Sequence, residues 1–142
     1  MIIKSNTFNN CTRGIAISNT AGGSHSSHDK NGNQTNLSQS GKDYIISDNI
    51  FNACEINSIY ASGQASVING LESYDYIENI DISNNIIKNN VQENTLNLIL
   101  CKNLNITNNK ILDGERAFRL SYCSVVNICE NIIKNFKLEG VY

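Results

Sequence analysis

Long apolar runs are missing from this chain of 142 residues. The longest one, Leu98 to Cys101, is far shorter than the roughly 18 residues that cross a bilayer, so the sequence excludes a transmembrane helix. The first six residues lack the basic and apolar regions of a secretory signal. We therefore expect a chain that stays inside the cell that makes it, or a part of a longer product.

An excess of positive charge is missing as well. The chain has 11 basic and 13 acidic residues, and the basic ones form no stripe. Nucleic-acid backbones and membrane surfaces attract clustered lysine and arginine. We therefore expect neither nucleic acid nor a membrane among its partners.

Proline and tryptophan are absent, whereas 25 asparagines and 21 isoleucines together make up about a third of the chain. Asparagine is poor in helices and ordinary strands but tolerates the left-handed backbone angles of tight turns. Isoleucine favours strands. The composition therefore predicts short strands alternating with tight turns.

One motif recurs along the chain. Five segments align without gaps, namely residues 4–11, 47–54, 83–90, 107–114 and 129–136. Each has phenylalanine or isoleucine two residues after a shared asparagine, and the last three follow a strand-like apolar alternation. The shared column is Asn6, Asn49, Asn85, Asn109 and Asn131.

The spacing of the column sets the length of one unit. Successive asparagines are 43, 36, 24 and 22 residues apart, and we interpret the last two spacings as one coil each. The longer spacings then contain insert loops at approximately 20–40 and 63–76. The alternative, in which the spacing of 43 is two coils, is disfavoured because the first insert lacks apolar alternation.

Units this short cannot bury their own apolar face, but stacking lets each coil cover the next at about 4.8 Å. Stacking also explains the asparagine column, because a side-chain amide both donates and accepts hydrogen bonds and can bond to its copies in neighbouring coils.

The repeat resembles the coils of the pectate-lyase-like right-handed parallel β-helix superfamily. In that superfamily three strands build each coil and an asparagine ladder occupies the tight turn between the second and third. The resemblance implies an all-β fold, a right-handed parallel β-helix (solenoid) of about four to five coils, in a single domain over residues 1–142. A left-handed β-helix fits poorly, because the spacing of 22 is not a multiple of its six-residue period.

Mapping the chain onto such coils places the first strand of each coil at 14–18, 58–62, 96–101, 117–121 and 139–142. Side-chain alternation then gives an outward column of Ala16, Tyr60, Ile99, Arg119 and Tyr142. Tyr60 and Ile99 are candidates for stacking on a sugar or contacting a partner. Otherwise they are isolated exposed residues or lie under an insert loop.

Polysaccharide-cleaving members of the superfamily carry their chemistry on the outer face of the first strand. The matching cluster here is Asp113, Glu115, Arg116 and Arg119, whose arginines could bind a sugar and whose carboxylates could act as an acid–base pair. The alternative is a solvated loop with its own ion pairs. The Asn-Thr-Asp, Asp-Asp, Gly-His-Gly and Arg-Ile-Lys segments of polygalacturonase-like members do not occur, nor does the acidic groove of pectate lyases, so no catalytic residue is carried over.

The five cysteines are an odd number, which argues against a closed disulfide framework. Cys11 and Cys54 share one column of the repeat, and Cys101 and Cys123 share another. Buried free thiols are the main interpretation, with a disulfide between stacked neighbours as the alternative. Free thiols suit the cytoplasm or a phage particle.

His25, His28 and Asp29 lie together in the first insert and could ligate zinc, but no fourth ligand is evident. A surface loop is the alternative interpretation. We therefore predict no metal and no cofactor.

These features favour a non-catalytic β-helix module that binds a polysaccharide or a partner protein, in a phage tail or a surface assembly. One alternative is a polysaccharide lyase or glycoside hydrolase of the superfamily, or a shortened relative. Another is a small intracellular inhibitor that acts by binding a protein.

The ends of the predicted solenoid suggest self-association. Met1 enters a strand at once, the last residues end in or just after one, and neither end shows an amphipathic capping helix. Open strand edges pair with other strands. We therefore expect a homo-oligomer or a part of a longer β-helix, and sedimentation of a clean monomer at micromolar concentration would contradict this expectation.

Overall fold

The computed structural model describes residues 1–19, 27–28, 31, 34–35, 41–68 and 70–138. These residues form strands and turns without a helix, and most of the strands belong to parallel sheets. The prediction of an all-β chain is confirmed. The described residues accordingly contain no helix long and apolar enough to cross a membrane.

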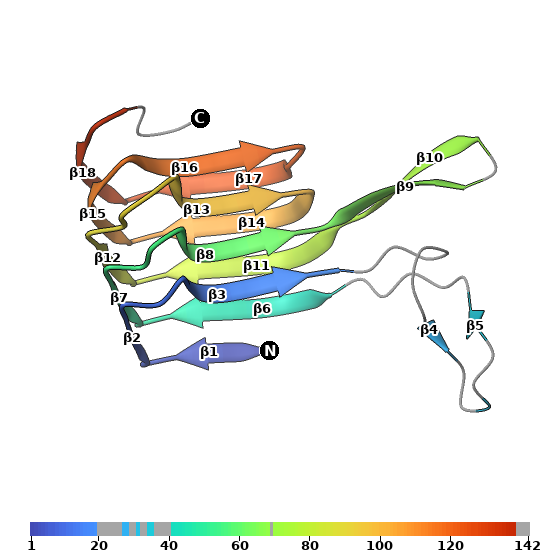
Figure 1. The fold of residues 1–142 in the computed structure, drawn as a ribbon, viewed down its shortest axis with the longest axis horizontal. Helices are drawn as coiled ribbons and strands as arrows, with labels where there is room; N and C mark the ends of the chain where they lie inside the picture. The colour runs from blue at the N-terminus through green and yellow to red at the C-terminus, as the bar shows by residue number, and fades with distance from the viewer. Residues whose placement is uncertain (20–26, 29–30, 32–33, 36–40, 69, 139–142) are drawn as a thin grey trace.

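Three parallel sheets, named A, B and C here, make up the body of the molecule (Figure 1). Sheet A contains β1 (Ile2–Lys4), β6 (Lys42–Ser47), β11 (Ile77–Ser83), β14 (Cys101–Thr107) and β17 (Ser124–Cys129). Sheet B contains β2 (Thr7–Asn9), β7 (Ile50–Asn52), β12 (Ile86–Lys88), β15 (Lys110–Gly114) and β18 (Ile132–Phe136). Sheet C contains β3 (Arg13–Ser18), β8 (Asn57–Ser62), β13 (Asn94–Ile99) and β16 (Arg116–Ser121).

The chain visits the sheets in the constant order A, B, C, and each pass adds one strand to each sheet it visits. Successive strands of a sheet are parallel and in register, so that equivalent residues of successive passes lie side by side. This arrangement turns each position of the repeat into a column across the passes.

Two segments interrupt the order, both after a strand of sheet C. Between β3 and β6 lie the antiparallel pair β4 (Ser27–His28) and β5 (Gln34–Thr35), and the rest of the first predicted insert lies largely outside the described residues. Between β8 and β11 the antiparallel hairpin of β9 (Gln64–Ile68) and β10 (Leu71–Asp75) projects from the body (Figure 1). This hairpin occupies the second predicted insert.

The apolar core fills the space between the three sheets. Phe8 and Phe51 of successive passes stack with ring centroids 4.7 Å apart. Gly14 is required beside them, because a Cβ there would lie 2.6 Å from the Phe51 ring. Fully buried side chains from all three sheets continue the core through the middle passes, namely Ile46, Ile82, Ile106, Phe51, Ile87, Ile111, Ile59, Leu96, Leu98 and Phe118.

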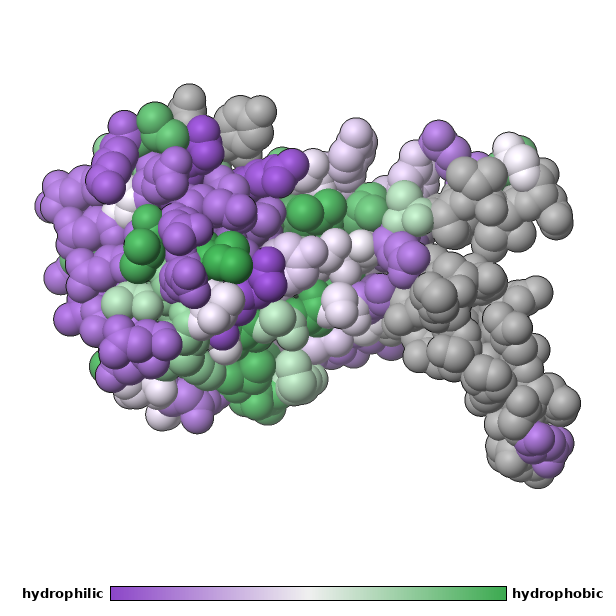
Figure 2. Space-filling view, in the orientation of Figure 1, coloured by the Kyte–Doolittle hydropathy of each residue, from purple (hydrophilic) through white to green (hydrophobic). Residues whose placement is uncertain are grey.

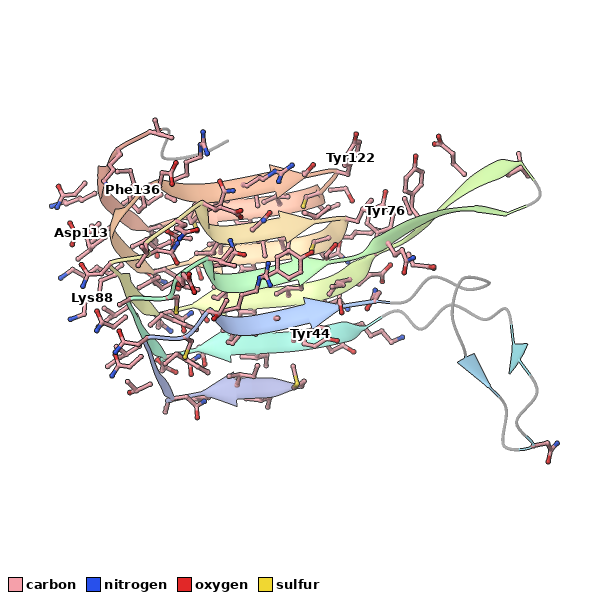
Figure 3. The ribbon with its side chains drawn as sticks, viewed as in Figure 1. Tyr44, Tyr76, Lys88, Asp113, Tyr122 and Phe136 are labelled. Carbon is pink, nitrogen blue, oxygen red and sulfur yellow. The ribbon has the colours of Figure 1, made fainter. Side chains whose placement is uncertain are left out.

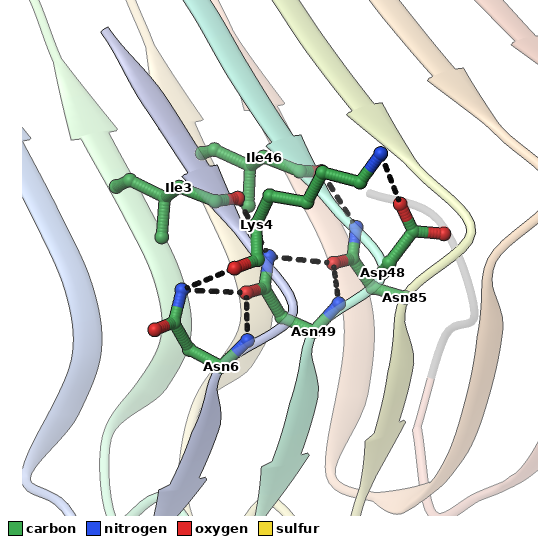
Figure 4. A network of polar contacts seen from close by, with 7 residues as sticks. All are labelled: Ile3, Lys4, Asn6, Ile46, Asp48, Asn49 and Asn85. Atoms are coloured by element: carbon green, nitrogen blue, oxygen red, sulfur yellow. Dashed lines mark hydrogen bonds and ion pairs between the residues drawn. The ribbon is translucent and has the colours of Figure 1, made fainter.

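The five column asparagines lie at the corner between sheets A and B and bond to one another. The Asn49 side-chain oxygen accepts the backbone N–H of Asn6 at 2.9 Å and its side-chain N–H at 3.2 Å (Figure 4). The same pair of bonds joins Asn49 to Asn85, and it repeats through Asn109 to Asn131. In every bond between two asparagines of this inner ladder, the donor comes earlier in the chain than the acceptor.

The residue before each ladder asparagine makes the corner. These residues have φ between 55° and 58°, in the left-handed region, and are Ser5, Asp48, Asn84, Asn108 and Glu130. Short polar side chains tolerate this region better than most. A second left-handed column marks the corner between sheets B and C, and consists of Asn10, Ala53, Asn89, Asp113 and Asn135.

Further amide ladders lie on the outside, and their bonds run the opposite way. Asn103 donates to Asn79 at 2.9 Å, and Asn79 donates to Asp43 at 2.7 Å. Asn127 likewise donates to Asn105 at 2.8 Å, and Asn105 donates to Asp81 at 3.4 Å. An ionised carboxylate can only accept, so each aspartate ends its ladder on the N-terminal side.

The burial of the inner ladder makes it the more costly one to break. We expect Asn85→Ala to lower the free energy of unfolding by about 2–4 kcal/mol, because it leaves the buried Asn49 N–H groups and the Ile46 carbonyl unpaired. Asn105→Ala, in the middle of a partly exposed outer ladder, should cost about 1 kcal/mol or less. Urea unfolding of both variants measures the difference, and equal losses would show that the inner ladder has no special weight.

Candidate functional site

Sheet C presents a column of mixed chemistry on its outer face. Register places Ala16, Tyr60, Asn97 and Arg119 side by side in successive strands. The residues on either side of this column, such as Leu96 and Leu98, are fully buried. Since side chains alternate along a strand, the column faces away from the core. The structure thus brings the predicted residues Tyr60 and Arg119 into one column.

The predicted place of Ile99 in this column is wrong, because Asn97 occupies it. Ile99 pairs instead with Ser62 and Ser121, two residues further along the strands. The error came from taking Leu98 and Leu100 as two inward residues of one strand. Strand β13 ends at Ile99, and Leu100 is a buried turn residue with φ of 50°. The fifth predicted member, Tyr142, lies outside the described residues.

A second row borders this column. Arg13 pairs with Asn57, and Asn94 pairs with Arg116. The Asn57 side-chain N–H donates to the Asn94 carbonyl at 2.6 Å, which joins the two pairs. The Arg13 guanidinium donates to the Asn57 side-chain oxygen at 3.3 Å and lies over the Tyr60 ring, 5.1 Å from its centroid. This cation–π contact ties the two rows together.

Two side-chain amides of β13 have acceptors without donors. The side-chain oxygens of Asn94 and Asn97 are buried and have no hydrogen-bond partner among the described residues. The residues themselves are only 7% and 6% exposed. Burying an unpaired acceptor costs about 1–3 kcal/mol, so packing alone gives no reason for asparagine at these two positions.

The predicted carboxylate cluster is divided in the structure. Asp113 lies in the corner between sheets B and C, accepts the Asn135 side-chain N–H at 2.9 Å, and lines a corner groove of about 380 Å³. Figure 3 shows it at the end of the molecule opposite Tyr122. Glu115 accepts the Glu93 backbone N–H at 3.2 Å and does not line that groove, and neither does Arg119. The expected acid–base pair therefore does not share a groove.

The outer face of sheet A holds a groove of about 390 Å³ that sequence reasoning missed. Two outer ladders supply its polar lining, namely Asp43, Asn79 and Asn103 on one side and Asp81 and Asn105 on the other. The sequence did contain a signal for this groove. These polar residues stand six and four positions before the inner-ladder asparagines, at the same spacings of 36 and 24 residues.

The remaining surface offers little for a metal. The described residues contain no group of three or more histidine, cysteine, aspartate or glutamate side chains that could hold a metal ion. Of the histidine motif in the first insert, His25 and Asp29 lie outside the described residues, and only the backbone of His28 is described.

Figure 2 shows hydrophilic residues over most of the edge where the strands of sheet B lie.

Asn97 gives a test of whether this face is built for folding or for binding. We expect Asn97→Val to leave the free energy of unfolding unchanged or to raise it by about 1 kcal/mol, because the variant removes an unpaired buried acceptor and suits a strand. Thermal and urea unfolding measure the change. A loss above about 2 kcal/mol would assign Asn97 to the architecture alone.

The outer face of sheet C thus combines the Tyr60 ring with the Arg13 and Arg119 guanidinium groups, around the buried and unpartnered amide oxygen of Asn97. Comparison of the chain with protein-family models, with curated proteins and with solved structures finds no match. The chemistry of this face is therefore the basis on which a function is assigned.

Proposed function

We propose that the chain is a right-handed parallel β-helix module of the pectate-lyase-like kind, and that it binds a glycan through the outer face of sheet C without catalysing a reaction. The strand order supports the first part, because every pass adds one parallel strand to each sheet it visits and the sheets enclose one core. The inner asparagine ladder at the corner between sheets A and B matches the ladder that the superfamily places between its second and third strands.

The observation that carries the binding proposal is the row of Tyr60, Asn97 and Arg119. An aromatic ring offers a face for a sugar ring. The Arg119 side chain has no hydrogen-bond or ion-pair partner within the described part of the chain, and a guanidinium binds a carboxylate through paired hydrogen bonds. The face therefore fits an acidic sugar, such as a uronic acid unit.

Non-catalytic binding is favoured over cleavage because the two candidate carboxylates, Asp113 and Glu115, lie outside the row of Tyr60 and Arg119. Asp113 is held by Asn135 in the corner groove, and Glu115 is held by the backbone of Glu93. Neither stands in the row of Tyr60 and Arg119. A partner protein is the alternative occupant of the same face.

Isothermal titration calorimetry with uronic-acid oligosaccharides and matched neutral ones tests the proposal. We expect the acidic sugars to bind more tightly, and Arg119→Ala to weaken their binding roughly 10- to 100-fold, since a hydrogen bond to a charged group contributes about 1.5–3 kcal/mol.

Lys110→Ala is the matched control, because it removes one exposed positive charge from sheet B. It should bind the acidic sugars as the unchanged chain does. Absence of glycan binding, or equal losses of affinity in Arg119→Ala and Lys110→Ala, would contradict a glycan site on sheet C. If the chain instead bound a protein and Arg119→Ala abolished that binding, the face would be a protein-binding surface.

A further inference from the structure

Four of the five free cysteines stand in two stacked pairs. The Glu55 backbone N–H donates to the Cys11 carbonyl, which places Cys54 beside Cys11 in the next pass. Lys102 pairs with Ser124, which places Cys101 beside Cys123. Neighbouring parallel strands lie about 4.8 Å apart, within the Cα separation of about 4.4–6.8 Å that a disulfide spans.

The Cys101–Cys123 pair lies at the corner between sheets C and A. Cys101 begins β14 and is fully buried, whereas Cys123 precedes β17 and is partly exposed. The register of β14 and β17 places the two cysteines side by side at the same corner. The Cys123 sulfur also lies 3.3 Å from the Leu98 carbonyl oxygen, a contact that holds it beside its partner.

We propose that Cys123 and Cys101 form an oxidation site for hydroperoxides, in which Cys123 is attacked first and Cys101 then closes a disulfide between two successive passes. The partly exposed Cys123 supplies access, and the buried Cys101 beside it in the next strand supplies the partner. This inference is independent of glycan binding.

The chemistry balances in two steps. The Cys123 thiolate attacks one oxygen of the peroxide, the O–O bond breaks, and the sulfur becomes a sulfenic acid while the other oxygen leaves, with a proton, as water or an alcohol. The Cys101 sulfur then displaces the sulfenic hydroxyl, forming the S–S bond and releasing water. In all, two thiols lose two electrons and two protons, and the peroxide is reduced.

The electrostatics favour this order of events. The neighbouring Cys101 side chain lowers the pKa of Cys123 to about 7, against the opposing effect of burial. The neighbouring Cys123 side chain, together with burial, raises the pKa of Cys101. At neutral pH Cys123 is therefore the sulfur that carries the reactive thiolate.

The chain contains two internal comparisons. The Cys11–Cys54 pair has the same stacking, but burial raises the pKa of Cys54. Cys129 is exposed and belongs to neither stacked pair. If access alone decided reactivity, Cys129 would be oxidised first. If stacking alone decided it, both pairs would close equally fast.

Peroxide treatment of the reduced full-length chain at pH 7, followed by mass spectrometry of the unreduced digest, tests the proposal. We expect the first product to be a cross-linked peptide joining Cys101 to Cys123. The peptide between Arg119 and Lys134 also contains Cys129, so the assignment is made in a Cys129→Ser background. A first disulfide between Cys11 and Cys54, or no disulfide in the folded chain, would overturn the proposal.

Cys101→Ser separates the two steps. In this variant peroxide should leave a sulfenic acid on Cys123 that dimedone traps, whereas Cys11→Ser should still form the Cys101–Cys123 disulfide. The rate of alkylation of Cys123 by iodoacetamide should rise with pH around a midpoint near 7 in the unchanged chain. The midpoint should move up towards the ordinary value of 9.0 in Cys101→Ala, because alanine cannot replace the neighbouring thiol that lowers the pKa of Cys123.

An unchanged midpoint in a folded Cys101→Ala variant would overturn the role given to Cys101. Circular dichroism checks that the variant folds. If it does not, the peptide mapping of the chain with both cysteines decides the question by itself.

Discussion

The directed stacking of side-chain amides is the interaction on which the rest of this structure depends. Each inner-ladder asparagine before Asn131 gives two N–H groups to the next asparagine oxygen and a third bond to a backbone carbonyl, as Asn85 does with Asn109 and Ile46. A carboxamide suits this pattern because it carries two N–H donors and an accepting oxygen. The ladder fixes the corner between sheets A and B in every pass, and thereby fixes the register in which isoleucines and phenylalanines meet in the core.

Much of this architecture could be predicted from the sequence because the repeat has a constant register. Once Asn85, Asn109 and Asn131 are aligned, each position of one pass predicts the position beside it in the next. That is why Tyr60 and Arg119 could be placed in one column. Ile99 could not, because an alternation of apolar residues looks the same whether the last one, Leu100, continues the strand or turns the corner.

The chemistry of the outer faces was harder to predict than the core. Whether an outward asparagine is exposed depends on the length of its neighbours in other passes, so the burial of Asn94 and Asn97 is not visible in one pass. Asp113 appeared to belong with Arg119 because they are six residues apart, but a left-handed corner and the start of a new strand separate them. The polar columns of sheet A repeat at the same spacings as the inner-ladder asparagines. This repeat is hard to see in the sequence, because the first member of one column is aspartate and that of the other is isoleucine.

Both long interruptions leave the body after a strand of sheet C, following β3 and β8, whereas the later passes close the same corner with a short turn. The strands on either side of the β9–β10 hairpin still pair in register with their neighbours. Chain length at this corner is thus uncoupled from the repeat itself. The C-to-A corner is consequently the natural place to graft a foreign peptide, since a segment added there would be displayed on a rigid scaffold whose internal spacing it does not disturb.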